Sequence, residues 1–280
     1  MTRFTDSKAI RLAALVALSL GSSVAGAAAA DLSDLPWLRG TVGNDSPGYL
    51  RWDGLQIGAQ IGLSNLSADF SSASNPQVAY ILRNTTLENE FSPSRWSTLP
   101  KATSNSSQFG GFIGYNMQWE QLVIGADIGY NRMRSMEASS ADSLERIVNT
   151  SDSVQHDVLL QSSSSLKLVD YGTFRARAGY AFGQFLPYAV IGGAVGRFSY
   201  NSTSTVTDRM SGAQNGVFQQ SASDARDNVF AAGFVAGLGA DVALLPNVFL
   251  RAEWEYTFFS PVNGIRSQLN TGRVGLGIRF

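Results

Sequence analysis

Apolar and polar residues alternate along much of the chain, and the clearest case is the stretch Ser107–Arg134. Two alternating runs lie there on either side of a short polar break. In the second run, one set of alternate positions is small or polar and the other is apolar: Leu122, Ile124, Ala126, Ile128 and Tyr130. Because successive side chains of a strand point to opposite faces of a sheet, this pattern predicts two strands joined as a hairpin.

The same two-residue period recurs and predicts eight strands between residues 52 and 280. Three tight turns alternate with longer connections. The turns lie within the hairpin of Ser107–Arg134, at Gly183-Gln184 and at Leu245–Asn247. The longer connections are rich in Ser and Asn and are predicted to be external loops, at 65–106, 136–165, 201–225 and, as a short one, 260–267. Short turns at one end and long loops at the other are typical of outer-membrane barrels. We therefore predict an all-β fold, an eight-stranded antiparallel up-and-down transmembrane β-barrel.

The first 30 residues have the features of a signal peptide. A basic start precedes the apolar run Leu12–Leu20, and Ala28-Ala29-Ala30 supplies an A-x-A cleavage site. The alternative is an N-terminal membrane anchor, but a membrane-spanning helix needs about 20 apolar residues. We predict a signal peptide over 1–30, and an irregular periplasmic segment over 31–51, where no period is clear.

Two other interpretations of the apolar stretches compete with a membrane barrel. Ala178–Gly196 carries no charge and could be taken for a membrane helix, but it contains Gly183-Gln184 and Pro187, and the flanking runs keep a period of two. A water-soluble barrel would place the apolar face inside. The apolar face is free of charge at its central positions, where a Lys or Arg facing lipid would cost about 2–4 kcal/mol.

Aromatic residues gather at the predicted strand ends, as expected of girdles at the two membrane interfaces. Trp119, Tyr180, Tyr188 and Phe280 are predicted near the turns, and Phe109, Tyr130, Tyr200 and Phe258 near the loops.

Charged residues fall on the face opposite the apolar one, and we expect them inside the barrel. An eight-stranded barrel is only just wide enough for its own side chains, and buried charges must be paired. We therefore predict an internal salt-bridge network in a lumen that is polar and mostly filled, with inward glycines leaving some space. The alternative is a narrow ion path lined by the same residues. They are Asp127, Arg175, Arg177, Asp241, Arg251, Glu253, Glu255, Arg273 and Arg279.

Composition and motifs give little support for chemistry. The absence of cysteine excludes disulfides and thiolate sites, and a net charge of −1 gives no reason to expect nucleic acid. The single histidine, His156, stands beside Asp157 in a Ser-rich stretch, where we expect a solvated loop residue rather than a catalytic triad. Glu253 and Glu255 could suit glycosidase-type carboxylates, but neighbouring arginines favour ion pairing. No phosphate-binding loop motif occurs. We predict no catalytic, cofactor or metal site.

Four runs in the predicted strands resemble a known family: GGFIGYNMQWEQLVIGADIGY (110–130), GTFRARAGYAFGQFLPYAVIGGAVG (172–196), AGFVAGLGADVALLPNVFLRAEWEY (232–256) and TGRVGLGIRF (271–280). They are similar to the small outer-membrane surface-antigen barrels of alphaproteobacteria, which are related to opacity-type and porin-like barrels. The resemblance implies an eight-stranded barrel with a structural or immunogenic surface role. Glu253 matches a glutamate of the family's seventh strand, whereas Glu255 stands where a basic residue is often found.

Three functions follow from this interpretation. The first is a structural barrel in the Gram-negative outer membrane that contributes to envelope integrity and displays its loops. The second is a small porin for ions or small solutes, and the third is a loop-mediated adhesin or ligand-binding surface protein. The expected partners are outer-membrane lipid, lipopolysaccharide, and the barrel-assembly machinery, which would act on the C-terminal strand ending in Phe280.

Overall fold

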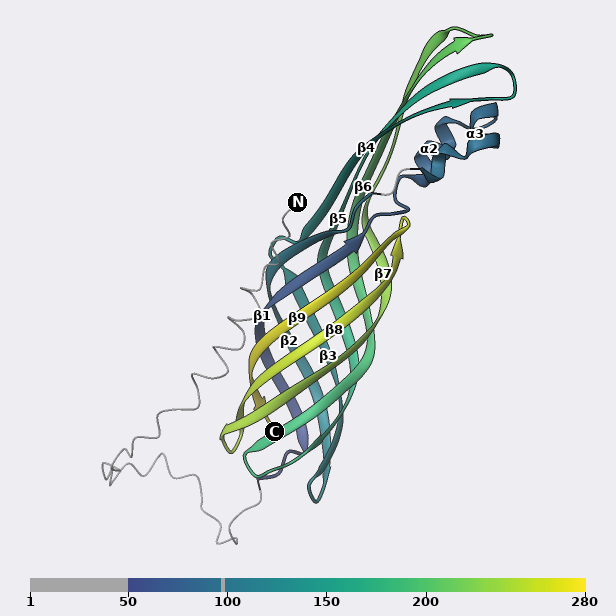
Figure 1. Ribbon diagram of the computed structural model, residues 1–280. Coiled ribbons are helices and arrows are strands. Elements are labelled where there is room, and N and C mark those ends of the chain that lie inside the picture. Colours follow the sequence, from purple (N-terminus) through teal and green to yellow (C-terminus); the bar gives the residue numbers. More distant parts are fainter. Residues whose placement is uncertain (1–49, 97–98) are drawn as a thin grey trace, which may run out of the picture. The chain divides into compact units, whose positions relative to one another are not determined.

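Eight antiparallel strands close into a ring in the computed structural model, which describes residues 50–96 and 99–280 (Figure 1). The ring consists of β1 (Gly54–Asp69), β2 (Ala102–Trp119), β3 (Leu122–Met133), β5 (Val154–Tyr180), β6 (Phe185–Gly212), β7 (Gly216–Leu245), β8 (Val248–Val262) and β9 (Ile265–Arg279). β3 pairs directly with β5, and β1 closes the ring by pairing with β9. The predicted fold class is confirmed. The predicted signal peptide and all but the last two residues of the predicted periplasmic segment lie outside the described residues.

Short turns join the strands at the end where β1 begins and β9 finishes. Glu120-Gln121 links β2 to β3, residues 181–184 link β5 to β6, and Pro246-Asn247 links β7 to β8. Gly183 has a φ of 61°, in the left-handed region that glycine adopts without a steric penalty. These are the three positions at which the sequence predicts tight turns.

The outer wall of the ring is apolar, as the alternation predicts. β6 directs Ile191 and Val195 outward and Val190 and Ala194 inward. Six of the eight predicted girdle aromatics are exposed on the wall: Trp119, Tyr180, Phe280, Phe109, Tyr130 and Phe258. The prediction is wrong for Tyr188 and Tyr200, which are buried because they lie on the inward face of β6.

The stretch that could be mistaken for a membrane helix is a strand hairpin. Ala178–Gly196 covers the end of β5, its turn and the first half of β6, with continuous cross-strand pairing from Gly179↔Tyr188 upward. Within residues 50–96 and 99–280, no helix is both long enough and apolar enough to cross a bilayer.

A sheet extends beyond the ring where the sequence predicts loops. β4 (Glu137–Asn149) pairs with β5, and β5, β6 and β7 continue upward as far as Val154, Gly212 and Gly216 (Figure 1). The stretches 136–165 and 201–225 are therefore mostly strand. Ser and Thr are frequent on both faces there, so the apolar alternation is weak, and hydroxyl pairs such as Ser164–Ser202, 2.7 Å apart, join the strands. We call this four-stranded extension the external sheet.

Short helices occupy the predicted loop at 65–106. Between β1 and β2 lie α2 (Asn75–Ile81), α3 (Thr86–Phe91) and the 3₁₀ turn η2 (Pro93–Arg95). Thr85 caps α3 by accepting a 3.1 Å hydrogen bond from the Glu88 amide. The helices pack on the inward face of the external sheet and share an apolar core with it: Val78, Ile81, Leu82, Leu87, Val158, Leu160 and Val206. We call the helices and the external sheet together the external lobe.

Candidate functional site

One group of buried charges lies where β3, β5, β8 and β9 face the lumen. Arg175 Nε lies 2.7 Å from Asp127 Oδ1, and Arg175 Nη1 lies 2.7 Å from Glu255 Oε2. From β9, Arg273 contacts both glutamates, since Nε lies 2.7 Å from Glu253 Oε2 and Nη2 lies 2.7 Å from Glu255 Oε2. Two guanidinium groups thus face three carboxylates, which leaves this upper group with one excess negative charge.

A second group lies closer to the short turns and has the opposite balance. Arg251 Nε lies 2.9 Å from Asp241 Oδ1, and Arg177 Nη2 lies 2.8 Å from Asp241 Oδ2. The Gln56 side-chain oxygen accepts hydrogen bonds from both arginines, at 3.0 Å from Arg251 and 3.3 Å from Arg177. Two guanidinium groups share one carboxylate, so this lower group carries one excess positive charge.

Tyr188 connects the two groups. Its hydroxyl donates a 2.8 Å hydrogen bond to Glu253 Oε1, and its ring lies under the Arg177 guanidinium at 3.8 Å. The formal charges of the two groups cancel, and the eight charged side chains are at most 2% exposed. Buried ions need an opposite charge beside them, because each one left unpaired costs several kcal/mol.

Arg279 is the one predicted lumen charge that stays outside this network. It donates a 2.6 Å hydrogen bond to the Pro246 carbonyl oxygen and lies 5.1 Å above the Trp52 ring, at the short-turn end of the lumen. Neighbouring Phe280 is exposed on the outer wall, and its amide donates a 2.9 Å hydrogen bond to the Leu55 carbonyl oxygen.

Apolar side chains fill the lumen on both sides of the charged layer. At the short-turn end, Trp52 is fully buried and donates a 3.1 Å hydrogen bond from Nε1 to the Gly183 carbonyl oxygen. It belongs to the lower apolar layer: Trp52, Phe112, Val123, Ala181, Leu186, Tyr188, Val190, Ala243 and Phe249. Toward the external lobe lies the upper apolar layer, which includes Leu66, Phe70, Tyr171, Phe198, Phe259 and Leu269.

The inward glycines do not leave the space that the sequence suggests. Gly58 faces Phe112 across the β1–β2 pair, and Gly277 faces Phe249 across β8–β9. A Cβ atom on Gly58 would lie 2.4 Å from Phe112 Cζ, and one on Gly277 would lie 2.3 Å from Phe249 Cζ. Aromatic rings therefore occupy the volume that these glycines release, an arrangement that also pins the strand register. The sequence does contain a signal for this packing, because each aromatic ring directly faces a glycine once the hairpin register is known.

His156 is not the solvated loop residue that the sequence suggests. It lies on the buried face of β5 in the external sheet, and its Nδ1 atom is 2.7 Å from Asp208 Oδ2 of β6. Its serine neighbours along β5, such as Ser162 and Ser164, pair with serines of β6 instead. The triad arrangement that we considered for this residue therefore does not form.

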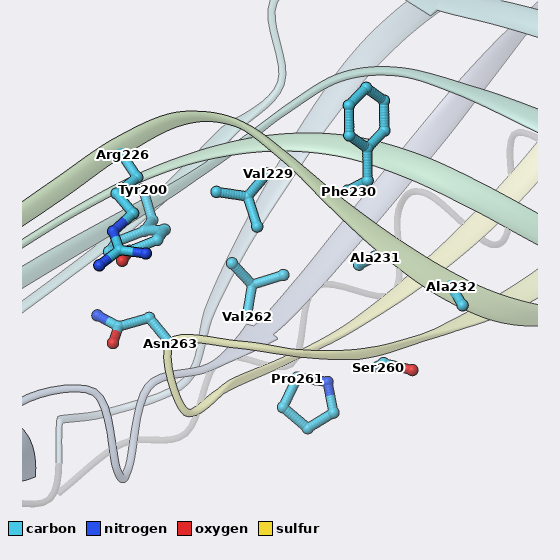
Figure 2. A pocket seen from close by; sticks show the side chains of 10 residues that line it. All are labelled: Tyr200, Arg226, Val229, Phe230, Ala231, Ala232, Ser260, Pro261, Val262 and Asn263. Carbon is cyan, nitrogen blue, oxygen red and sulfur yellow. The ribbon is translucent and has the colours of Figure 1, made fainter.

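The wall of the barrel has a shallow hollow where β7 stops pairing with β8. It measures about 280 Å³, and Figure 2 shows its lining: Tyr200, Arg226, Val229, Phe230, Ala231, Ala232, Ser260, Pro261, Val262 and Asn263. Most of these side chains are apolar, and the hollow holds no pairing of a nucleophile with a base. Across the described part of the chain, no cluster of three or more His, Cys, Asp or Glu side chains could hold a metal ion.

A closed eight-stranded ring with an apolar wall agrees with the family that comparison with known proteins finds. The family model described as the outer membrane protein beta-barrel domain matches residues 13–280. The chain belongs to this family. It is an outer-membrane β-barrel surface protein, and it resides in the outer membrane of Gram-negative bacteria. The family is one of non-enzymatic surface barrels.

Individual relatives share low sequence identity with this chain. The 25 kDa outer-membrane immunogenic protein of Brucella canis is 28% identical over 194 residues, which cover 66% of this chain and 70% of that one. Its counterpart in Brucella abortus biovar 1 is 27% identical over the same length, with the same coverage.

Among solved structures, Ail of Yersinia pestis is 13% identical, with a TM-score of 0.33 over 81% of this chain and 99% of that one. OprG of Pseudomonas aeruginosa is 11% identical, with a TM-score of 0.36 over 81% of this chain and 96% of that one.

Proposed function

We propose that this protein is a structural barrel with a closed lumen, which strengthens the outer membrane and presents the external lobe at the cell surface. The observation that carries the proposal is the filling of the lumen in three successive layers. The lower apolar layer, the charge network and the upper apolar layer follow one another from the short turns to the external lobe. A hydrated ion would have to displace side chains in each layer.

The charge network supports a structural role over a conducting one. A selectivity filter presents charged or carbonyl groups to a passing ion. Here each guanidinium and carboxylate of the network already has an opposite charge within 4.0 Å. An ion entering this layer would have to compete with short, buried ion pairs, which favours a lumen that rigidifies the barrel.

Single-channel recording in planar bilayers tests the proposal. Folded protein, verified by heat-modifiable gel mobility, should give no steady conductance, while a general porin in the same bilayers serves as the positive control. Reproducible unitary conductance from the folded protein would overturn the closed-lumen proposal in favour of a small porin.

A second function, ligand binding at the cell surface, is favoured by apolar side chains on the external lobe. Tyr80 on α2, Ile147 on β4 and Val217 on β7 are all exposed, although the lobe is otherwise rich in Ser, Thr and Asn. Exposed apolar residues mark a binding surface where they adjoin one another in a patch. Replacing residues 70–101 with a short turn should abolish adhesion to host cells or matrix while leaving the barrel folded. Unchanged adhesion would exclude the helices as the binding surface.

We further propose that the barrel-assembly machinery acts on β9 and on Phe280, which directly follows it and lies on the lipid-facing wall. Deleting Phe280 should lower the amount of assembled protein in the outer membrane, measured by gel mobility of membrane fractions. The matched variant Leu245→Ala changes an exposed apolar residue at the same end of the barrel and should assemble normally.

A further inference from the structure

The lipid-facing column of β3 changes character just above the upper aromatic girdle. Ile128 and Tyr130 are exposed on the apolar wall, and the alternation continues to Arg132 and to Arg134, which lies one residue beyond the end of β3; both arginines are exposed. Asn131 and Met133, between them, face inward and are buried. The two arginines therefore point away from the barrel, at the height where hydrocarbon gives way to the polar surface of the membrane.

Neighbouring strands add to this cationic edge. Lys167 on β5 is exposed, and Asp170, three residues farther along β5, lies opposite Arg132 on one side and Arg197 of β6 on the other. From the strand spacings, these groups lie within roughly 15 Å of one another. We call Arg132, Arg134 and Lys167 the cationic rim.

The carboxylate in this region is already engaged. Asp170 is paired with Arg197, whose Nε donates a 3.1 Å hydrogen bond to it, and the Tyr130 hydroxyl donates another at 3.0 Å. The three side chains of the cationic rim take part in none of the ion pairs formed by the described residues. Glu137, which faces Lys167 in the β4–β5 register, is the other acidic residue beside the rim. The region thus keeps two excess positive charges: four cations against Asp170 and Glu137.

The other strands carry a different distribution of charge at the same height. On β1, β2 and β9 the outward positions at this height are mainly Asn, Ser, Thr and Gln, and Lys101 is paired with Asp69 at 3.5 Å. On β7, Arg226 stands between Asp224 and Asp227 and lies 3.8 Å from Asp224. Arg266 of β9 lies opposite Asp69, so Lys101 and Arg266 against Asp69 leave one excess positive charge on the β1–β9 side. The larger excess, of two, lies on the β3–β5 side of the barrel.

We propose that the cationic rim binds the phosphate groups of a phosphorylated glycolipid in the outer leaflet, that is, of lipopolysaccharide. Guanidinium groups bind phosphate oxygens through paired, charge-assisted hydrogen bonds, and an ammonium group adds a point charge. The rim directly adjoins the apolar wall, so acyl chains can lie against Ile128 and Tyr130 while the phosphates meet the arginines. A soluble anion would gain no such apolar contact. The proposal depends on the lipid-facing wall and not on whether the lumen conducts.

The test compares lipid binding by folded protein in detergent micelles, using a bis-phosphorylated lipid A and its dephosphorylated form as probes. The wild type should retain the phosphorylated lipid more tightly. In the triple variant R132Q/R134Q/K167Q the preference should fall by about fivefold for each cation removed. The matched double variant K101Q/R266Q, which removes two cations from the β1–β9 side, should keep the wild-type preference.

Each other outcome overturns the proposal. Equal binding of the two lipids by the wild type would show that phosphate is not recognised, and an unchanged preference in the triple variant would place recognition elsewhere. Loss of lipid binding in excess inorganic phosphate at constant ionic strength would show a site for free anions instead. Because all three side chains are exposed, the variant should fold, which gel mobility verifies; the variant R132K/R134K provides a conservative alternative that should retain most of the preference.

Discussion

β5 passes through two regions of the molecule that bury opposite kinds of side chain. Within the barrel, Phe174 points outward and is 64% exposed, while neighbouring Arg175 is buried in the lumen. In the external sheet, Val158 points inward and is fully buried, while Gln161 faces outward and is exposed. The register shift between Leu168 and Asp170 marks the boundary between the two regions.

The difference shows that the medium outside the wall determines which residues lie inside it. Lipid covers the barrel, so apolar residues face outward, and the interior is held together by ion pairs between aromatic layers. Water surrounds the external lobe, so its apolar residues gather inside, and its core is the ordinary hydrophobic core of a soluble domain. We therefore expect substitutions in the two regions to have effects of different kinds.

The largest effect is expected in the charge network. Arg175→Met leaves Asp127, Glu253 and Glu255 with Arg273 as the remaining cation of the upper group. Breaking a buried ion pair from one side costs about 3–5 kcal/mol, so the free energy of unfolding should fall by that amount. Urea unfolding in lipid vesicles measures it. Arg266→Met, on the exposed side of β9, should change the value by less than about 0.5 kcal/mol; equal effects would contradict the role of the network.

The second prediction concerns the core of the external lobe. Leu87 of α3 is buried in it, and Leu87→Ala should cost about 2–5 kcal/mol of local stability. The loss should detach the helices without unfolding the barrel, because the barrel has its own layers of contacts. Limited proteolysis should then cut within 70–101 while the heat-modifiable barrel remains intact. Tyr80→Ala, at an exposed position on α2, should leave the segment protected, and joint unfolding of lobe and barrel would contradict their independence.

A smaller effect is expected where glycine makes room for an aromatic ring. Gly58→Ala places a methyl group against Phe112 in the lower apolar layer, and overpacking of this kind costs about 1–3 kcal/mol. Gly272→Ala adds the same methyl group at a position with no atom within 4 Å and should be nearly neutral. The difference between the two midpoints of urea unfolding measures the tightness of the lumen. A neutral Gly58→Ala would mean that the interior is loosely packed.

The smallest effect concerns pH at the tip of the β4–β5 hairpin. The Thr150 hydroxyl donates a hydrogen bond to Asp152, and this bond lowers the pKa of that carboxyl below its ordinary value of 3.8. A carboxyl whose pKa is lower in the folded state stabilises the hairpin above pH 3.8, and the contribution is lost as the pH falls through the folded-state pKa. Titration followed by NMR should give a midpoint below 3.8, and Thr150→Val should raise it. An unchanged midpoint in that variant would rule out the hydroxyl as the cause.

The ring could be predicted from the sequence because lipid imposes a simple rule. A strand such as β3 must direct Leu122, Ile124 and Ile128 to one side, so a period of two survives in the sequence. The charges of the lumen follow from the same rule, since they occupy the opposite positions. Their partners do not, because pairs such as Arg175 with Glu255 join strands 80 residues apart and depend on how the ring closes.

The external sheet was missed for the opposite physical reason. Its strands have water on one face and a thin core on the other, so Ser163 and Ser164 alternate between solvent and interior without any change in polarity. The prediction for His156 was wrong because burial at this site comes from a distant segment, through its pairing with Asp208. The burial of Trp52, which is hydrogen-bonded to Gly183, has the same origin. Such contacts between distant segments leave no periodic signal in the chain.

The pairing of β1 with β9 also dictates when this protein can become stable. The ring closes only when β9 pairs with β1, with Arg279 opposite Gln56. These residues lie near the two ends of the part of the chain that forms the barrel. A chain that lacks β9 would keep two unpaired strand edges, whose amide and carbonyl groups find no hydrogen-bonding partner in a bilayer. Closure of the ring therefore requires β9, and a chain without it has no stable partly closed state in the membrane.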